Sequence, residues 1–144
     1  MEIKDYIKEY IKAGDPRSYR VFGRFLRERR QEAGKTLCSF ADDLNISPTY
    51  LSDIEKGNRP VPDRLIDQLK GMLVISKEEE PYFYDLAYSS RCNHPDINEY
   101  LERTPSARMF LRLAMRKNLS DEEFMQYFNK MVAEKEKKEK DRSL

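Results

Sequence analysis

The sequence has few of the residues on which catalytic, metal-binding and disulfide-rich proteins depend. It contains one histidine, His94, and two cysteines, Cys38 and Cys92, which lie far apart and outside any CxxC pair. The cluster Cys92-Asn93-His94 offers two potential metal ligands, whereas a zinc site needs four, or three and a water. Without a second histidine, no Ser-His or Cys-His nucleophile can be assembled elsewhere. The sequence therefore predicts no metal site, no cofactor, no catalytic residues and no enzymatic activity.

Glycine-rich loops and long apolar runs are also missing. The chain has only five glycines, and they form no phosphate-binding loop. No window approaches the roughly 20 apolar residues of a membrane span. The first residues, MEIKDYIKEYIKAG, are interrupted by charges, unlike a signal peptide, and the cysteine usage favours a reducing compartment. We expect a soluble cytoplasmic protein with no membrane partner.

Charge and helical periodicity dominate what is present. Charged residues make up 37% and hydrophobic residues 39% of the 144 residues, with a formal net charge of +1. Apolar residues recur at helical spacing and no segment alternates with the period of a strand, so the predicted fold class is all-α. We expect an N-terminal amphipathic helix and linker, a compact helical domain, a helical C-terminal region for dimerisation or regulation, and a charged tail, at 1–16, 17–75, 76–133 and 134–144 respectively.

The stretch 37–56 is the best defined part of the pattern. It predicts two short helices joined by a tight turn, with the small Ala41 where the helices cross. Asn45 lies at the corner, where a left-handed backbone conformation is expected, and Asn adopts it at low cost. Ser47 and Pro48 suit the N-cap and the first turn of the second helix. These features predict a helix-turn-helix, with an inner face made of Phe40, Leu44, Ile46, Leu51 and Ile54.

A basic helix precedes this motif. Between Arg17 and Lys35 there are seven basic and two acidic residues, a local excess of five. Such a run is usually a solvated helix face. Because it directly precedes a helix-turn-helix, we interpret it as a surface that attracts phosphates.

The motif and its flanks carry several further signatures in a fixed order. They are Glu32-Ala33-Gly34, Phe40-Ala41, Asn45-Ile46-Ser47 and the run from Tyr50 to Gly57, YLSDIEKG. In this order and spacing, residues 19–73 resemble the Xre-type (Cro and phage-repressor-like) helix-turn-helix regulators. The resemblance implies a sequence-specific transcriptional regulator, repressor-like, that binds double-stranded DNA as a homodimer and places residues 48–56 in the major groove.

The resemblance also assigns candidate DNA contacts, residue by residue. The base-facing candidates are Pro48, Thr49, Ser52 and Asp53. The phosphate candidates are Lys35, Thr36, Tyr50, Lys56, Asn58 and Arg59, although Tyr50 could equally pack against the domain. The family pairs an arginine of the preceding helix with the glutamate before the final Lys-Gly, which implies a structural ion pair between Arg30 and Glu55.

A second hypothesis is that the same fold serves as a scaffold for protein binding. Leu37 stands where the family often has Gln, and Leu cannot make the same hydrogen bond. Asp53 on the recognition surface and the near-neutral total charge are also unusual for a DNA-binding surface. These features favour, as the alternative, a protein-interaction module such as an antitoxin or regulator subunit, which would bind a protein partner through the aromatic segment 82–88 and the C-terminal helices.

Overall fold

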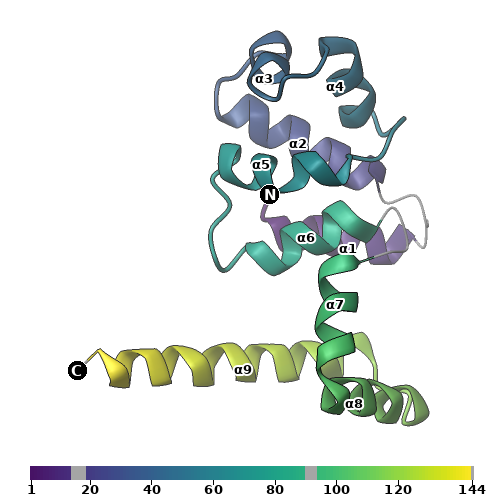
Figure 1. The fold of residues 1–144 in the computed structure, drawn as a ribbon, viewed down its shortest axis with the longest axis vertical. Helices are drawn as coiled ribbons and strands as arrows, with labels where there is room; N and C mark the ends of the chain where they lie inside the picture. The colour runs from purple at the N-terminus through teal and green to yellow at the C-terminus, as the bar shows by residue number, and fades with distance from the viewer. Residues whose placement is uncertain (14–18, 90–93, 144) are drawn as a thin grey trace. The chain divides into compact units, whose positions relative to one another are not determined.

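The computed structural model describes residues 1–13, 19–89 and 94–143, and within these ranges the regular structure is entirely helical (Figure 1). This confirms the predicted all-α fold class. The helices are α1 (Ile3–Ala13), α2 (Tyr19–Glu32), α3 (Leu37–Asp43), α4 (Pro48–Glu55), α5 (Asp63–Met72), α6 (Glu80–Ser89), α7 (Pro95–Arg103), α8 (Pro105–Arg116) and α9 (Asp121–Arg142).

The chain divides into two compact units, Met1–Pro95 and Asp96–Leu144. The first unit contains α1 and α6 together with α2 to α5, because α2 packs against α1 and α6 as well as α4. The functional division expected from the sequence stays a prediction. The last residues of the expected N-terminal helix and linker, 14–16, lie outside the described residues.

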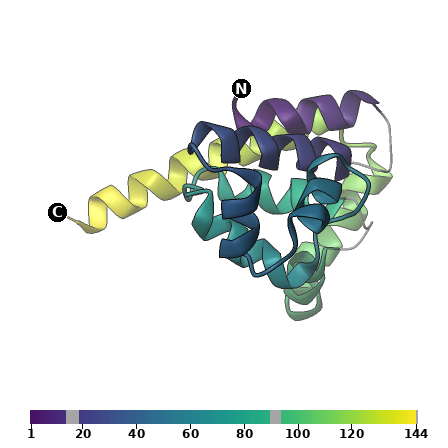
Figure 2. The same cartoon turned by 90° about the horizontal axis from the view of Figure 1, so that it is seen from above.

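The first unit is built around α2. In Figure 1, α3 and α4 form one end of the unit, α2 and α5 the middle, and α1 and α6 the other end. Figure 2, seen from above, shows α1 and α2 running side by side, in agreement with their direct packing. This arrangement lets one central helix hold both the motif and the flanking helices.

Aromatic side chains join α1, α2 and α6 in the core. Tyr6 and Phe25 are both buried and meet edge to face with ring centroids 5.3 Å apart, and Phe22 meets Phe83 at 6.0 Å. Such pairs add about 0.5–1.5 kcal/mol each to the area that they bury. Ala33, just beyond the C-terminal end of α2, is exposed and takes no part in this core.

The aromatic surface of α6 is largely used within the first unit. Phe83 is completely buried, and Tyr84 and Tyr88 are half-buried and stack with their ring centroids 6.0 Å apart. The Tyr84 hydroxyl donates to Asp67 of α5 at 2.8 Å. The expectation that this helix offers its aromatic side chains to a protein partner is therefore not favoured by their packing.

The second unit has very little core. Phe110 of α8 meets Tyr127 of α9 edge to face, with ring centroids 6.4 Å apart. The α9 helix begins with a capping box of Ser120 and Glu123 and continues to Arg142, so most of the charged tail is helical. Ala114 is the only buried residue among those described in this unit. No described helix combines the length and the apolar character that a membrane span requires.

Candidate nucleic-acid interface

Local capping interactions form α3, α4 and the turn between them. The hydroxyl of Thr36 accepts the Ser39 backbone N–H at 3.1 Å, and that of Ser47 accepts the Tyr50 N–H at the same distance. Asn45 has φ 55°, the left-handed conformation predicted for the corner. Around it, the N–H groups of residues 45 and 46 donate to the carbonyls of residues 42 and 41, which closes the end of α3. The turn is thus fixed by its own sequence.

The second helix of this pair, α4, has one accessible face and one buried face. Pro48 and Thr49 are exposed, and Ser52 and Asp53 are half-buried, so the four base-facing candidates share one side of the helix. Residues on the opposite side are among the most buried of the first unit: Leu51 and Ile54 are at most 1% exposed. Burial of Leu51 and Ile54 therefore fixes the orientation of α4 relative to the core.

Three of the sequence-predicted residues come together after the end of α4. The Arg59 guanidinium lies 5.4 Å from the centre of the Tyr50 ring, and its Nε lies 3.7 Å from a carboxylate oxygen of Asp53. Arg59 remains 58% exposed at its side chain, so its N–H groups can still donate to an external anion. The carboxylate of Asp53, which is unfavourable beside a polyanion, is neutralised by a neighbouring cation.

The remaining phosphate candidates lie around this helix without forming one cluster. Lys56 and Asn58 are exposed just beyond the C-terminal end of α4. Lys35 is exposed as well, but its ammonium lies 3.3 Å from Asp43. Thr36 uses its hydroxyl oxygen as the N-cap of α3 and keeps its O–H free to donate.

The basic charges of α2 are mostly paired, which corrects the interpretation of this helix as a phosphate-attracting surface. Arg24 pairs with Glu9 of α1, and Arg29 pairs with Glu79 at 2.6 Å, just before α6. Arg30 pairs with Glu55, and Lys35, which follows α2, pairs with Asp43. Because Arg17 lies outside the described residues, only Arg20 and Arg27 remain exposed without an ion pair to a described carboxylate. These charges hold the helices together and leave little excess for DNA.

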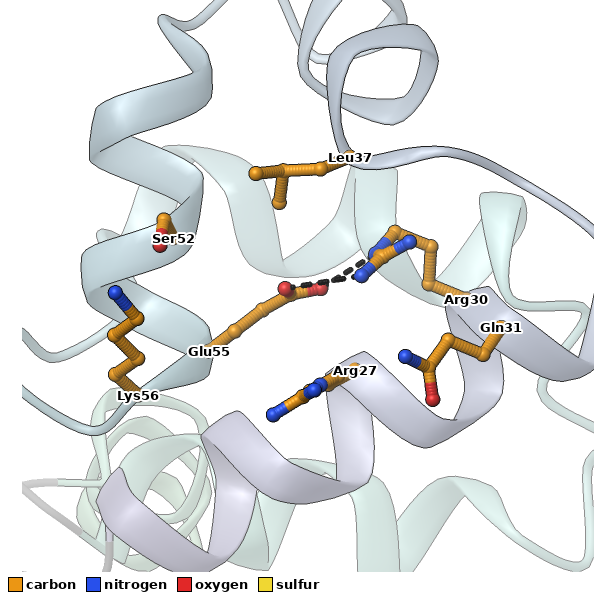
Figure 3. A pocket seen from close by; sticks show the side chains of 7 residues that line it. All are labelled: Arg27, Arg30, Gln31, Leu37, Ser52, Glu55 and Lys56. Carbon is orange, nitrogen blue, oxygen red and sulfur yellow. Dashed lines mark hydrogen bonds and ion pairs between the residues drawn. The ribbon is translucent and has the colours of Figure 1, made fainter.

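The Arg30 and Glu55 side chains lie in contact, as Figure 3 shows. Nε and Nη2 of the guanidinium donate to the two carboxylate oxygens at 2.6 and 3.2 Å, while Nη1 donates to the Lys35 carbonyl at 2.7 Å. The two side chains are only 8% and 5% exposed. This bidentate pair joins α2 to the C-terminal end of α4.

A small pocket lies beside this pair, between α2 and α4. Its volume is about 190 Å³. Figure 3 shows Arg27 and Lys56 at its sides, with Gln31, Leu37 and Ser52 completing the wall. Three cations against one carboxylate give the lining a formal excess of positive charge, which suits a small anionic group.

One glycine explains how closely α2 approaches α4. A Cβ added to Gly23 would lie 2.3 Å from the Ile54 carbonyl oxygen and 2.7 Å from that of Glu55. Both distances are far inside van der Waals contact. The two helix backbones can meet here only because the residue has no side chain.

Comparison with known proteins bears on this pair of helices. Residues 21–70 match the family model of a helix-turn-helix domain. The match runs from α2 into α5, about a third of the chain, and includes all of α3 and α4. The curated proteins and the solved structures gave no match. The predicted helix-turn-helix is thus supported, while the narrower Xre assignment remains a prediction.

Two residues of the helix-turn-helix domain line the pocket but are not among the candidates predicted from the sequence. Arg27 and Gln31 of α2 face the pocket next to Lys56, although they lie far from it in sequence. Their spacing of four residues places them on one side of a helix, which was the available signal. Away from the domain, no group of three His, Cys, Asp or Glu side chains able to hold a metal ion occurs among the described residues, and Cys92 lies outside them.

Proposed function

We propose that the chain is a sequence-specific DNA-binding transcriptional regulator of the Xre type, repressor-like, which acts as a homodimer on double-stranded DNA. The observation that carries the proposal is the two-faced α4. Its polar face is accessible, and its buried face is fixed to α2 by the Arg30–Glu55 pair. A recognition helix needs this combination, because base edges can be read only by side chains held in a constant position.

The proposed roles follow from where the side chains lie. Thr49 and Ser52, one turn apart, contact base edges through their hydroxyls. Arg59, held by Asp53 and Tyr50, donates to a phosphate, and so Asp53 acts chiefly by positioning Arg59. Because its charge is already paired with that of Arg59, Asp53 has less need of a cytosine amino group as partner.

Lys56 contributes charge in a different way. It flanks the pocket together with Arg27, and we propose that this pocket receives a backbone phosphate on the α2 side of the recognition helix. Leu37 lines the same pocket, so the cations replace the hydrogen bond that a Gln at this position would supply. Phosphate contacts of this kind set the register of the protein on DNA and carry no sequence information.

The homodimer follows from the size of the recognition surface. One short helix contacts too few bases for a specificity of about 10³ or more over other DNA. Two copies related by a two-fold axis read two half-sites about one helical turn apart.

Selection from random duplexes tests the proposal without knowledge of the operator. The selected duplex and a scrambled one are then titrated by fluorescence anisotropy at two salt concentrations. We expect the selected duplex to bind about 10³-fold more tightly than the scrambled one, and both affinities to fall as salt rises. No enrichment and no binding at low salt would refute the proposal.

Matched variants separate the roles. Thr49→Val removes a hydroxyl and keeps the shape, so it should weaken binding to the selected duplex alone. Lys56→Gln should weaken both duplexes about equally and lower the salt dependence by about one phosphate contact. Lys77→Gln removes the same charge from the exposed segment before α6 and should change neither.

A protein-interaction module is the second candidate function. It is favoured by the exposed apolar side chains of the second unit, such as Met109 and Met131, which are 67% and 58% exposed. Under this alternative the helix-turn-helix domain serves as a scaffold and the selection from random duplexes recovers no sequence.

A further inference from the structure

Exposed apolar side chains are concentrated in the second unit. Of the twelve large hydrophobic residues that are exposed in the described ranges, ten lie between Ile97 and Val132. Ala114 is the only described residue that this unit buries. A unit of about 50 residues depends on burying apolar surface, and one that buries so little needs a partner for stability. The exposed surface therefore calls for an occupant.

We propose that the apolar surface of α8 and α9 binds a second copy of the chain, with the two α9 helices packed antiparallel about a two-fold axis near Phe128. We define this α8–α9 surface by Met109, Phe110, Leu113, Tyr127, Met131 and Val132. The inference rests on the homodimer of the proposed function and deepens it by naming the interface and its orientation.

The shape of the surface is self-complementary. An open groove of about 600 Å³ runs between the two helices, with Phe110 on one side and Phe124, Tyr127 and Met131 on the other. The apolar residues of α9 recur at spacings of three and four, so they form both a wall of this groove and a ridge along the helix. Under a two-fold axis, each ridge can enter the groove of the other copy.

The area agrees with that of a stable dimer. The side chains of the α8–α9 surface are between 40% and 67% exposed. Taking about 150–250 Å² for each large side chain, they expose roughly 500–800 Å² of apolar surface, which at its upper end reaches the ~800 Å² per partner of a standard interface. A larger partner is not needed to cover it.

The charges of α9 favour the antiparallel orientation. Its first turn carries Asp121, Glu122 and Glu123 and no cation. An antiparallel copy places this turn beside the segment 130–138, which has four lysines and two glutamates. A parallel copy would instead place the two acidic turns side by side, where like charges repel. The acidic first turn of α9 is thus complementary in charge to the segment 130–138 of the same helix in another copy. This complementarity favours a second copy of the chain as the occupant of the α8–α9 surface.

Sedimentation equilibrium of the full chain without DNA tests the interface. We expect a species of twice the 17.2 kDa chain mass. Met131→Lys should raise the dissociation constant at least 100-fold, whereas Asn129→Lys, which adds the same charge two residues away on the polar side of α9, should change it less than threefold. Circular dichroism of both variants checks that the helices remain formed.

Cross-linking tests the orientation, in a background in which Cys38 and Cys92 are replaced by serine. Tyr127→Cys lies near the proposed axis and should cross-link to its own copy with a short bis-maleimide. Lys138→Cys lies about 30 Å from its own copy in the antiparallel arrangement, at 1.5 Å per residue, and should not react. Equal cross-linking at both positions would overturn the antiparallel arrangement.

The outcomes for the interface and for the proposed function can be told apart. A chain that is monomeric at 100 μM, or a dimer that Met131→Lys leaves intact, overturns the interface whether or not the chain binds DNA. A monomer that associates through this surface only with a different protein overturns it as well. A dimer that Met131→Lys dissociates but that selects no DNA supports the interface and refutes the proposed function.

Discussion

Replacing Glu55 by alanine is the most direct test of how the recognition helix is held. The substitution removes a carboxylate that accepts two hydrogen bonds from Arg30 and leaves the guanidinium with one partner, the Lys35 carbonyl at 2.7 Å. Because Arg30 is only 7% exposed, water cannot fully replace the missing contacts. An uncompensated charge therefore remains inside the first unit.

The expected loss can be worked out from this geometry. Removing one partner of a buried pair costs about 3–5 kcal/mol. The pocket of about 190 Å³ beside the pair admits water to the guanidinium, which favours the lower end of that range. For a unit of about 100 residues, ~3 kcal/mol corresponds to a fall in Tm of about 12–24 °C.

Thermal unfolding followed by circular dichroism measures the effect, with Asp43→Ala as the control. The Lys35–Asp43 pair is nearly half exposed, so its loss should cost at most ~1 kcal/mol. The double variant Arg30→Met, Glu55→Leu removes both charges and should be more stable than Glu55→Ala. A Tm for Glu55→Ala within about 5 °C of the wild type, or equal to that of Asp43→Ala, would show that the pair does not hold α4.

Three further predictions concern the backbone, a cap and the pH response of the first unit. Gly23→Ala should lower the free energy of unfolding in urea by at least ~2 kcal/mol, because its Cβ would lie 2.3 Å from a carbonyl oxygen of α4. In the control Gly71→Ala the Cβ has nothing within 4 Å, so this free energy should rise by ~0.5–1 kcal/mol. Equal changes in the two variants would contradict this packing. Thr36→Ala should cost ~1 kcal/mol by the same measurement, because the Ser39 N–H loses its partner, and no loss would mean that the cap is dispensable. The hydrogen bond from Arg29 lowers the pKa of Glu79, so this carboxylate stabilises the fold above its unfolded pKa and loses that contribution as pH falls through the folded pKa. Glu79→Gln should therefore reduce the fall in Tm between about pH 5 and pH 3. An unchanged pH profile of Tm would refute this assignment.

The parts of the site that the sequence predicted are those decided by neighbouring residues. The cap at Ser47 and the left-handed Asn45 depend on contacts within a few residues, and both occur as expected. The inner face of α3 and α4 follows from helical spacing in the same way. Local chemistry was therefore sufficient for the shape of the motif.

The parts that the sequence did not predict depend on distant residues. Arg24 and Arg29 form ion pairs with partners 15 and 50 residues away. The arginines that suggest a phosphate-binding surface in the sequence therefore form ion pairs within the first unit. The Arg30–Glu55 pair was expected only from the family resemblance. Gly23 carries no local sign of its close approach to α4, because that distance depends on how two helices pack.

The internal pairing of the cations on α2 has a consequence for how such a protein would find its site. Non-specific attraction to DNA depends on the number of unpaired cations that can replace bound counterions. With Arg24, Arg29 and Arg30 occupied by carboxylates, α2 has only Arg20 and Arg27 to offer. A regulator of this design would slide little along unrelated DNA and would find its operator mainly by repeated dissociation and re-encounter. Its search time would then depend on the number of molecules per cell more than on the salt concentration.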